Sequence, residues 1–174
     1  MANATFEDIF DAPFTYHARP RPIACELRPV WRLHVLVLIL EKCRGGQANM
    51  EQLHVLNWAA RTRESRQDFL AFLSGKRTPS QIIVRYDPSL NRAVHFAFAE
   101  DLVTRRELQL SLNGERNGSS PPYRVLLTKK GRELLKQIHS MDDCFTGLKQ
   151  FLDAIPQKVS QKQIEMLFSW GANQ

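Results

Sequence analysis

The middle of the chain carries apolar residues at helical spacing. Behind a turn at residues 87–89 that can cap a helix, apolar residues recur every four positions. They are Leu90, Val94, Phe98 and Leu102. The pattern predicts one helix that ends near Val103.

Two runs with the composition of β-strands follow, at Glu107–Leu112 and Tyr123–Thr128. The segment between them is polar and rich in turn-forming residues, which predicts a hairpin with a long tip. A helix capped by Thr128 comes next. Its apolar positions are Leu134, Leu135 and Ile138. Helix, hairpin and helix in this order are typical of a winged helix, so we expect a mainly α (α+β) fold in which the hairpin is the wing.

The N-terminal half predicts further helices. One should run from Pro29 to Cys43, and it is apolar on nearly all sides, which places it at the buried centre of the domain. A strand over Val35–Ile39 is the alternative. Gly45 and Gly46 should end this element.

Two polar motifs predict the next helix starts. Asn49 and Gln52 have capping-box spacing and predict a helix from Met50 to about Thr62, and Ser65 should cap another helix that ends at Gly75. The β-branched run Gln81–Tyr86 is predicted to be a strand that pairs with the base of the hairpin.

The C-terminal segment carries two more apolar stripes. The first ends before Pro156 and consists of Phe145, Leu148, Phe151, Leu152 and Ile155. A second capping box, Ser160 with Gln163, opens a last helix that carries Ile164, Leu167, Phe168 and Trp170. One winged helix does not need this much apolar surface. We therefore divide the chain into an arm and strap (residues 1–28), a winged-helix domain (29–140) and a helical extension (141–174).

The N-terminal arm is acidic and carries large apolar side chains. They include Phe6, Ile9, Phe10 and Phe14. Such residues need a surface to lie on, either the protein's own core or a groove of a partner. A proline-rich strap, Arg19–Pro29, then leads into the domain in an extended form.

The net charge of +6 is concentrated in two segments. Residues 61–92 hold seven basic and three acidic side chains, and residues 105–132 hold seven basic and two acidic ones. A basic face of this kind can follow phosphates, although a solvated surface explains it equally well.

The sequence gives no sign of catalysis. We find no glycine-rich phosphate loop, serine elbow or zinc-ligand spacing, so we expect no enzyme, no metal, no cofactor and no small-molecule substrate. The odd, widely spaced cysteines indicate reduced thiols. The longest apolar run, Leu33–Leu40, falls short of the roughly 20 residues that a membrane span needs, and no secretion signal is visible, so we expect a cytoplasmic protein without membrane contact.

The helix that starts near Ser89 stands where a winged helix carries its DNA reader. Its candidate base contacts are Asn91, Arg92 and His95. Candidate backbone contacts are Arg105, Arg106, Arg116, Lys129 and Lys130. Phe96 and Phe98 lie about 200° apart on a helix and cannot both face one core. A groove reader tolerates an exposed Phe poorly, so this helix should be contacted by protein on both sides.

Four blocks of the sequence resemble the small middle components of bacterial ABC-three-component systems. They are Arg28–Leu33, Cys43–Gly46, Gln52–Trp58 and Asp87–Ala93. A weaker match lies at the exit of the hairpin, in Leu127, Thr128, Gly131 and Leu134. The resemblance spans residues 28–138.

This resemblance implies a winged-helix partner of an SMC- or Rad50-like ATPase and an effector, as in Lamassu-type antiphage defence. The chain would then be a non-catalytic accessory subunit that helps to hold double-stranded DNA through its backbone. Its predicted partner contacts are Phe6, Ile9, Phe10, Phe14, Phe96, Phe98, Phe151 and Trp170. The alternative is a winged-helix transcription regulator.

Overall fold

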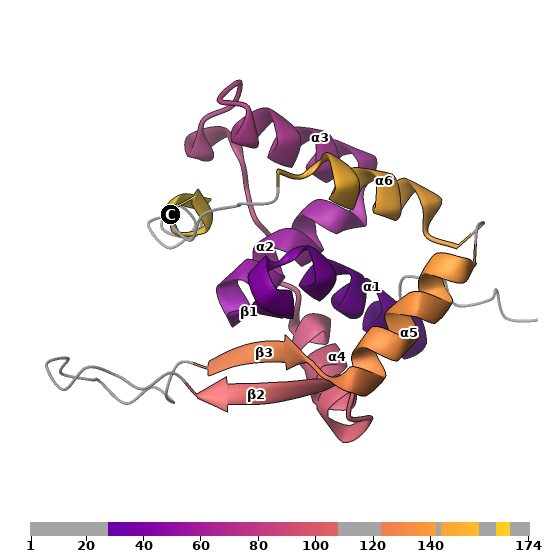
Figure 1. Cartoon of the computed structure of the whole chain (residues 1–174). Coiled ribbons are helices and arrows are strands. Elements are labelled where there is room, and N and C mark those ends of the chain that lie inside the picture. The colour runs from indigo at the N-terminus through magenta and orange to yellow at the C-terminus, as the bar shows by residue number, and fades with distance from the viewer. Residues whose placement is uncertain (1–27, 108–122, 142–143, 157–162, 168–174) are drawn as a thin grey trace, which may run out of the picture.

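The computed structural model describes residues 28–107, 123–141, 144–156 and 163–167, and this part is mainly helical with a small three-stranded antiparallel sheet (Figure 1). The helices are α1 (Pro29–Lys42), α2 (Met50–Arg61), α3 (Arg63–Leu73), α4 (Pro88–Ala99), α5 (Lys129–Ser140) and α6 (Thr146–Ala154), with 3-10 turns η3 (Arg44–Gly46) and η4 (Pro79–Gln81) and a further helical stretch at residues 163–167. The strands are β1 (Gln47–Ala48), β2 (Val103–Glu107) and β3 (Tyr123–Leu127). The predicted mainly α, α+β class is confirmed.

Helix α1 forms the centre of the core, as its apolar sequence predicts. Every residue from Val35 to Leu40 is at most 2% exposed. The helix packs against α2, α4, α5 and α6, which surround it in Figure 1. The alternative of a strand over Val35–Ile39 is therefore wrong. Gly45 and Gly46, both with positive φ, turn the chain after α1 as predicted.

The caps of α2 and α3 follow one design. Asn49 Oδ1 accepts a hydrogen bond from Gln52 N at 2.8 Å, and Gln52 Oε1 accepts one from Asn49 N at 3.1 Å, so the predicted capping box is confirmed. For α3, Ser65 is not the cap but the third helical residue. Thr62 is the cap, and Ser65 completes a second capping box with it. The two helices are thus separated by a single residue.

The third strand of the sheet comes from an unexpected place. β3 lies in the middle of the sheet and pairs with β2 on one edge and with β1 on the other. Both edges of β3 are therefore occupied over the paired residues, and the predicted strand Gln81–Tyr86 does not form. That segment instead connects η4 to α4, with Ile82 buried and Ile83 exposed.

Helix α4 ends at Ala99, four residues before the predicted end near Val103. Asp101 takes the left-handed conformation (φ 54°), and Leu102 N donates to Ala97 O at 2.9 Å, which closes the helix with a Schellman-type bond. The next strand consequently starts at Val103, earlier than the predicted Glu107.

The exit of the hairpin is locked to the end of α4. Thr128 caps α5 as predicted, with Oγ1 accepting from Gly131 N at 3.1 Å and donating to Leu102 O at 3.0 Å. A Cβ on Gly131 would lie 2.2 Å from Leu102 O, so only glycine fits this first turn of α5. The two segments can approach this closely only because residue 131 has no side chain.

The predicted C-terminal extension shares the core of the domain. Its buried residues are Leu148, Phe151, Leu152, Ile155, Ile164 and Leu167. Phe151 is only 5% exposed and meets Phe69 edge to face at 6.4 Å between ring centroids. The prediction that Phe151 faces a partner is therefore corrected, because the protein's own core covers this ring.

None of the described helices combines the length and the apolar character that crossing a membrane requires.

Candidate functional site

The exposed face of α4 joins basic and apolar side chains. Arg92, His95 and Phe96 stand three and four residues apart, and all three are exposed, Phe96 by 50% of its surface. Phe98 packs against the core on another side of the helix. The expectation that one of the two rings must face outward is confirmed, and the outward ring is Phe96.

The hairpin presents two arginines side by side. Arg106 of β2 is the direct cross-strand partner of Arg124 of β3, so both side chains leave the same face of the sheet, and both are exposed. Like charges directly opposite each other destabilise a strand pair. Neither has an ion-pair partner among the residues that the structure describes. An anion bound here would remove this repulsion.

Arg105 belongs to the opposite face of the hairpin. Its cross-strand partner is the buried Val125, and its guanidinium lies over the ring of Tyr123, 4.2 Å from the centroid. The three hairpin arginines therefore do not form one patch. Arg106 and Arg124 face one way and Arg105 the other.

The start of α5 adds two exposed lysines, Lys129 and Lys130. Lys130 lies 3.8 Å from Glu100 at the end of α4, a weak surface pair. Positive charge at a helix N-terminus opposes the helix dipole. Lys129 therefore does not stabilise α5 through the helix dipole.

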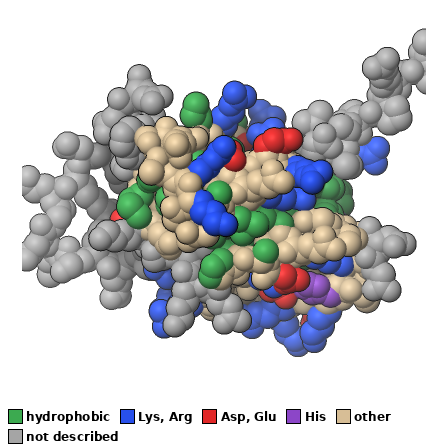
Figure 2. Space-filling view, turned by 90° about the horizontal axis from the view of Figure 1, so that it is seen from above, with side chains coloured by type: hydrophobic (Ala, Val, Ile, Leu, Met, Phe, Trp, Pro, Cys, Tyr) green, Lys and Arg blue, Asp and Glu red, His purple; other side chains and the backbone are tan. Residues whose placement is uncertain are grey.

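Of the seven basic residues of segment 61–92, four are exposed and their side chains have no hydrogen bond or ion pair to another described residue. They are Arg63, Lys76, Arg85 and Arg92. The other three contact groups of the fold. Arg66 donates to the backbone oxygens of Ala60 and Gly147, and Arg77 pairs with Asp68. Figure 2, which views the molecule from above Figure 1, shows Lys and Arg side chains scattered over this face with hydrophobic side chains between them. The first of the two basic segments is therefore only partly structural. Its exposed Arg92 lies on α4, and α4 and the hairpin form the candidate anion surface.

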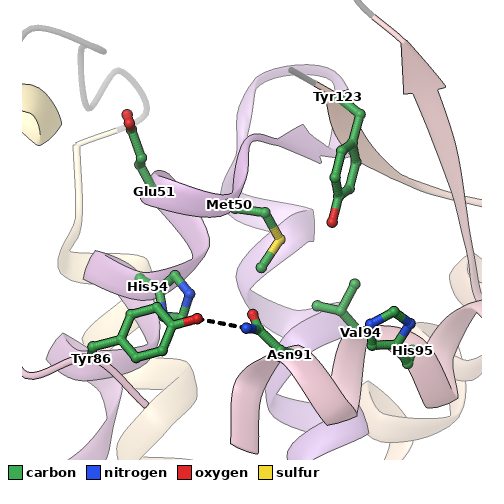
Figure 3. Close-up of a pocket in the computed structure, with 8 residues that line it drawn as sticks. All are labelled: Met50, Glu51, His54, Tyr86, Asn91, Val94, His95 and Tyr123. Atoms are coloured by element: carbon green, nitrogen blue, oxygen red, sulfur yellow. Dashed lines mark hydrogen bonds between the residues drawn. The ribbon is translucent and has the colours of Figure 1, made fainter. Parts of the chain in front are cut away.

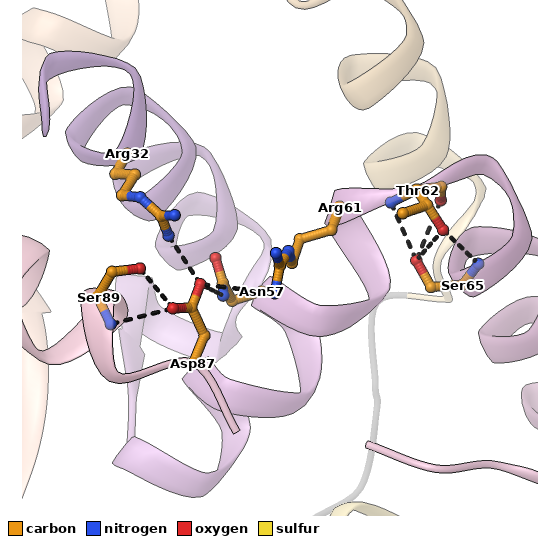
Figure 4. Close-up of polar contacts among 7 residues, drawn as sticks. All are labelled: Arg32, Asn57, Arg61, Thr62, Ser65, Asp87 and Ser89. Atoms are coloured by element: carbon orange, nitrogen blue, oxygen red, sulfur yellow. Dashed lines mark hydrogen bonds and ion pairs between the residues drawn. The ribbon is translucent and has the colours of Figure 1, made fainter. Parts of the chain in front are cut away.

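Asp87 is the centre of a satisfied polar cluster at the start of α4 (Figure 4). This carboxylate is 8% exposed and caps the helix by accepting from Ser89 N at 3.0 Å and from the Ser89 hydroxyl. Its other oxygen accepts from Arg32 Nη1 of α1 at 2.7 Å and from Asn57 Nδ2 of α2 at 3.4 Å, and Arg61 lies 3.9 Å away. One side chain thus ties three helices together.

The environment of Asp87 keeps it charged. Burial alone would raise the pKa of this carboxyl, but hydrogen bonds from Ser89 and Arg32 together with the Arg32 charge lower the pKa well below its usual 3.8. A hollow of about 290 Å³ lies beside the cluster and is lined by Trp31, Arg32, Asn57, Arg61 and Thr62. Its polar side chains already have partners, because Arg32, Asn57 and Arg61 contact Asp87 and Thr62 bonds to Ser65, so this hollow offers few free groups.

A second hollow, of about 370 Å³, opens between α2, α4 and β3 (Figure 3). Its lining consists of Met50, Glu51, His54, Tyr86, Asn91, Val94, His95 and Tyr123. We call it the His54 hollow. The predicted residues Asn91 and His95 meet here, whereas Arg92 does not line it.

The His54 hollow contains polar atoms without partners. His54 is 5% exposed and packs against the Tyr86 ring, with centroids 4.2 Å apart. Asn91 Nδ2 donates to the Tyr86 hydroxyl at 2.6 Å, but Asn91 Oδ1 and His54 Nδ1 are buried without a hydrogen-bond partner among the described residues. Burial lowers the pKa of His54 against the opposing effects of the Asp87 charge and the nearby Asn91 amide, so the imidazole is neutral at pH 7.

Several predicted contacts lie outside the described residues. They are Phe6, Ile9, Phe10, Phe14, Arg116 and Trp170, together with the Ser160 cap. Conversely, Tyr86 and Tyr123 were not predicted as site residues, because nothing in their local spacing indicates that both line one hollow with α2.

The cysteines and acidic residues add no further candidate. Cys43 and Cys144 are free thiols, and burial raises the pKa of Cys43 to about 12. Within the described part of the chain, no three His, Cys, Asp or Glu side chains gather as metal ligands would.

No protein-family profile matches this sequence, and searches of curated proteins and of solved structures find no significant match either.

Proposed function

We propose that this protein is a non-catalytic, winged-helix accessory subunit that assembles with an SMC- or Rad50-like ATPase and an effector in antiphage or antiplasmid defence. The order α1, β1, α2, α4, β2, β3 resembles that of a winged helix with α3 inserted before α4, and it supports this proposal. The sequence blocks that resemble ABC-three-component middle subunits support the same reading. In this proposal α4 and the hairpin face partners, and the complex acts in the cytoplasm.

Phe96 is the observation that carries the proposal. It is a large apolar ring, 50% exposed, in the last turn of α4, on the helix that a DNA reader would turn toward a groove. Base edges and phosphates offer such a ring little. A protein partner that covers it would bury apolar surface, with Arg92 and His95 as a polar rim.

The hairpin supplies a second contact, to the DNA backbone. The opposed Arg106 and Arg124 suit phosphate oxygens and carry no base specificity. This binding would be weak, indifferent to sequence and steeply dependent on salt.

Co-purification tests the assembly role. The full chain is co-expressed with the coiled-coil ATPase and effector that a system of this kind encodes beside it, as wild type and as Phe96→Glu. We expect the wild type to co-purify with the ATPase and Phe96→Glu to lose at least about tenfold in affinity, as a charged group at the centre of an interface does.

Met141→Glu is the matched control, since Met141 is exposed by 52% but lies at the end of α5. It should co-purify like the wild type. A chain that elutes alone, as monomer or homodimer, from the co-expressed system would overturn the proposal.

A transcription regulator is the second candidate. Arg92 and His95 favour it, because both are exposed on α4 and neither has a hydrogen bond or ion pair to another described residue. This function requires tight binding to one operator, with Arg92→Ala costing about 1–3 kcal/mol at a single base pair. Equal, weak binding to all sequences that disappears in salt would exclude it.

A further inference from the structure

The His54 hollow differs from the Asp87 cluster because it contains buried polar atoms without hydrogen-bond partners. Its volume of about 370 Å³ lies in the range of about 300–1,000 Å³ that small-ligand pockets occupy. Two of its polar atoms, His54 Nδ1 and Asn91 Oδ1, are buried without partners among the described residues. Such atoms are rare in folded proteins because each carries a desolvation cost, and they often mark a place where something else binds.

The residues that line the His54 hollow indicate which chemical class of ligand it can bind. The lining contains no Lys or Arg, so an anionic group would find no counter-charge inside. The one acidic side chain of the lining, Glu51, is exposed and has an interaction partner of its own, and the Arg105 guanidinium already lies over the Tyr123 ring, so a cation is disfavoured as well. What remains is an uncharged, planar group with hydrogen-bonding edges, to which the rings of Tyr86, His95 and Tyr123 offer aromatic surface.

The hydrogen-bonding groups suit the edge of a heterocycle. Asn91 Oδ1 is an acceptor, and the neutral His54 imidazole offers one donor and one acceptor nitrogen. The Tyr86 hydroxyl accepts from Asn91 Nδ2 and can still donate its own proton. Figure 3 shows the hydroxyl of Tyr123 directed into the hollow from the side opposite Tyr86. Donors and acceptors therefore meet in one place, as in pockets that read an unstacked base.

Positive charge lies at the margin of the hollow instead of inside it. The guanidinium of Arg105 stacks on the ring of the lining residue Tyr123, 4.2 Å from its centroid. An uncharged base within and a cation outside match the two parts of a nucleotide.

We propose that the His54 hollow binds the base of an unpaired nucleotide whose phosphate lies against Arg105. The nucleotide can be free or part of a single strand, and both share this chemistry. The site goes beyond the proposed assembly role and does not depend on it.

The test compares two fluorescently labelled DNA single strands of equal length and charge, one with ordinary nucleotides and one with abasic sites at its central positions. Binding of the full chain is followed by fluorescence anisotropy. The wild type should bind the ordinary strand about tenfold more tightly, because only that strand offers bases to stack. Equal affinity for the two strands would overturn the proposal.

Substitutions of exposed residues test whether the base binds in the His54 hollow. Tyr86 is exposed by 58%, so Tyr86→Ala should leave the fold intact and remove most of the discrimination between the strands. Ile83→Ala is the control, since Ile83 is exposed by 72%, lies close before Tyr86 in the same connecting segment and does not line the hollow. If Tyr86→Ala fails to fold, Tyr86→Phe, which keeps the ring and removes the hydroxyl bound by Asn91, should still weaken binding of the ordinary strand. Discrimination that survives in the folded Tyr86 variant would place the base elsewhere and defeat the assignment.

Competition by nucleoside monophosphates separates the two sources. Displacement of the ordinary strand by millimolar monophosphate assigns the site to free nucleotides, whereas displacement by unlabelled strand alone assigns it to single strands. Co-purification with the ATPase is measured on the same variants. Tyr86→Ala should retain it, so that failure of the base site and failure of the assembly role give different results.

Discussion

Two polar clusters lie at the first turns of α4, and they differ in whether their buried polar atoms have hydrogen-bond partners. Around Asp87, each carboxylate oxygen has donors, which come from α1, α2 and the α4 N-terminus. Around Asn91, one helical turn after Asp87, the buried atoms Asn91 Oδ1 and His54 Nδ1 have no hydrogen-bond partner among the described residues. A satisfied cluster stabilises the fold, while an unsatisfied one lowers stability and is available to a ligand.

Removal of the Asp87 carboxylate should cause the largest loss in the free energy of unfolding. Asp87→Ala leaves Arg32 unpaired at 13% side-chain exposure and removes the cap of α4, so we expect a loss of about 3 kcal/mol in the free energy of unfolding, measured by urea denaturation. Asp153→Ala, which breaks an exposed pair with Lys42, is the control and should have little effect. Equal effects of the two substitutions would show that the Asp87 cluster is not structural.

The two arginines beside Asp87 should differ from each other. Arg32 is nearly buried and 2.7 Å from the carboxylate, whereas Arg61 is 48% exposed and 3.9 Å away. We expect Arg32→Gln to cost about 2 kcal/mol and Arg61→Gln less than about 0.5 kcal/mol in the same urea experiment. The reverse order would mean that Arg61 carries the charge compensation.

Acid should weaken the Asp87 cluster selectively. Because the folded state lowers the pKa of Asp87, its contribution is fully present above the ordinary value of 3.8 and is lost as pH falls below it toward the folded pKa. The stability difference between wild type and Asp87→Asn should thus stay constant from pH 7 to about pH 5 and shrink below about pH 4. Denaturation at a series of pH values tests this, and a difference that shrinks above pH 5 would contradict it.

The smallest change is expected in the His54 hollow. Asn91→Leu keeps the approximate shape, removes the unpaired Oδ1 and sacrifices one exposed hydrogen bond to Tyr86. These effects oppose each other, so stability should change by less than about 0.5 kcal/mol. The same variant should bind the ordinary single strand more weakly in the anisotropy assay. A loss of stability as large as that of Asp87→Ala would place Asn91 with the structural residues.

Local signals in the sequence predicted the helices well. The apolar run of α1, the Asn49–Gln52 capping box and the Thr128 cap each depend on residues within one or two turns of each other. The errors arose where distant segments decide. The end of α4 depends on the left-handed conformation of Asp101, and the third strand depends on which distant segment pairs with the second edge of β3.

The candidate sites were only partly predictable for the same reason. Asn91, Arg92, His95 and Phe96 could be identified because they share one helix. Arg105 and Arg106 are neighbours in sequence but face opposite sides of the hairpin, and alternation along a strand fixes this only once the pairing is known. Tyr86 and Tyr123 reach the His54 hollow from segments far apart in the chain.

The contact between Gly131 and Leu102 has a mechanical consequence. The backbone that enters the hairpin and the helix that leaves it touch with no side chain between them, and Thr128 bonds across the same point. The base of the hairpin is therefore joined directly to the start of α5, and α5 packs on α1. A force applied to the hairpin would act first at this junction, and Gly131→Ala would disrupt it.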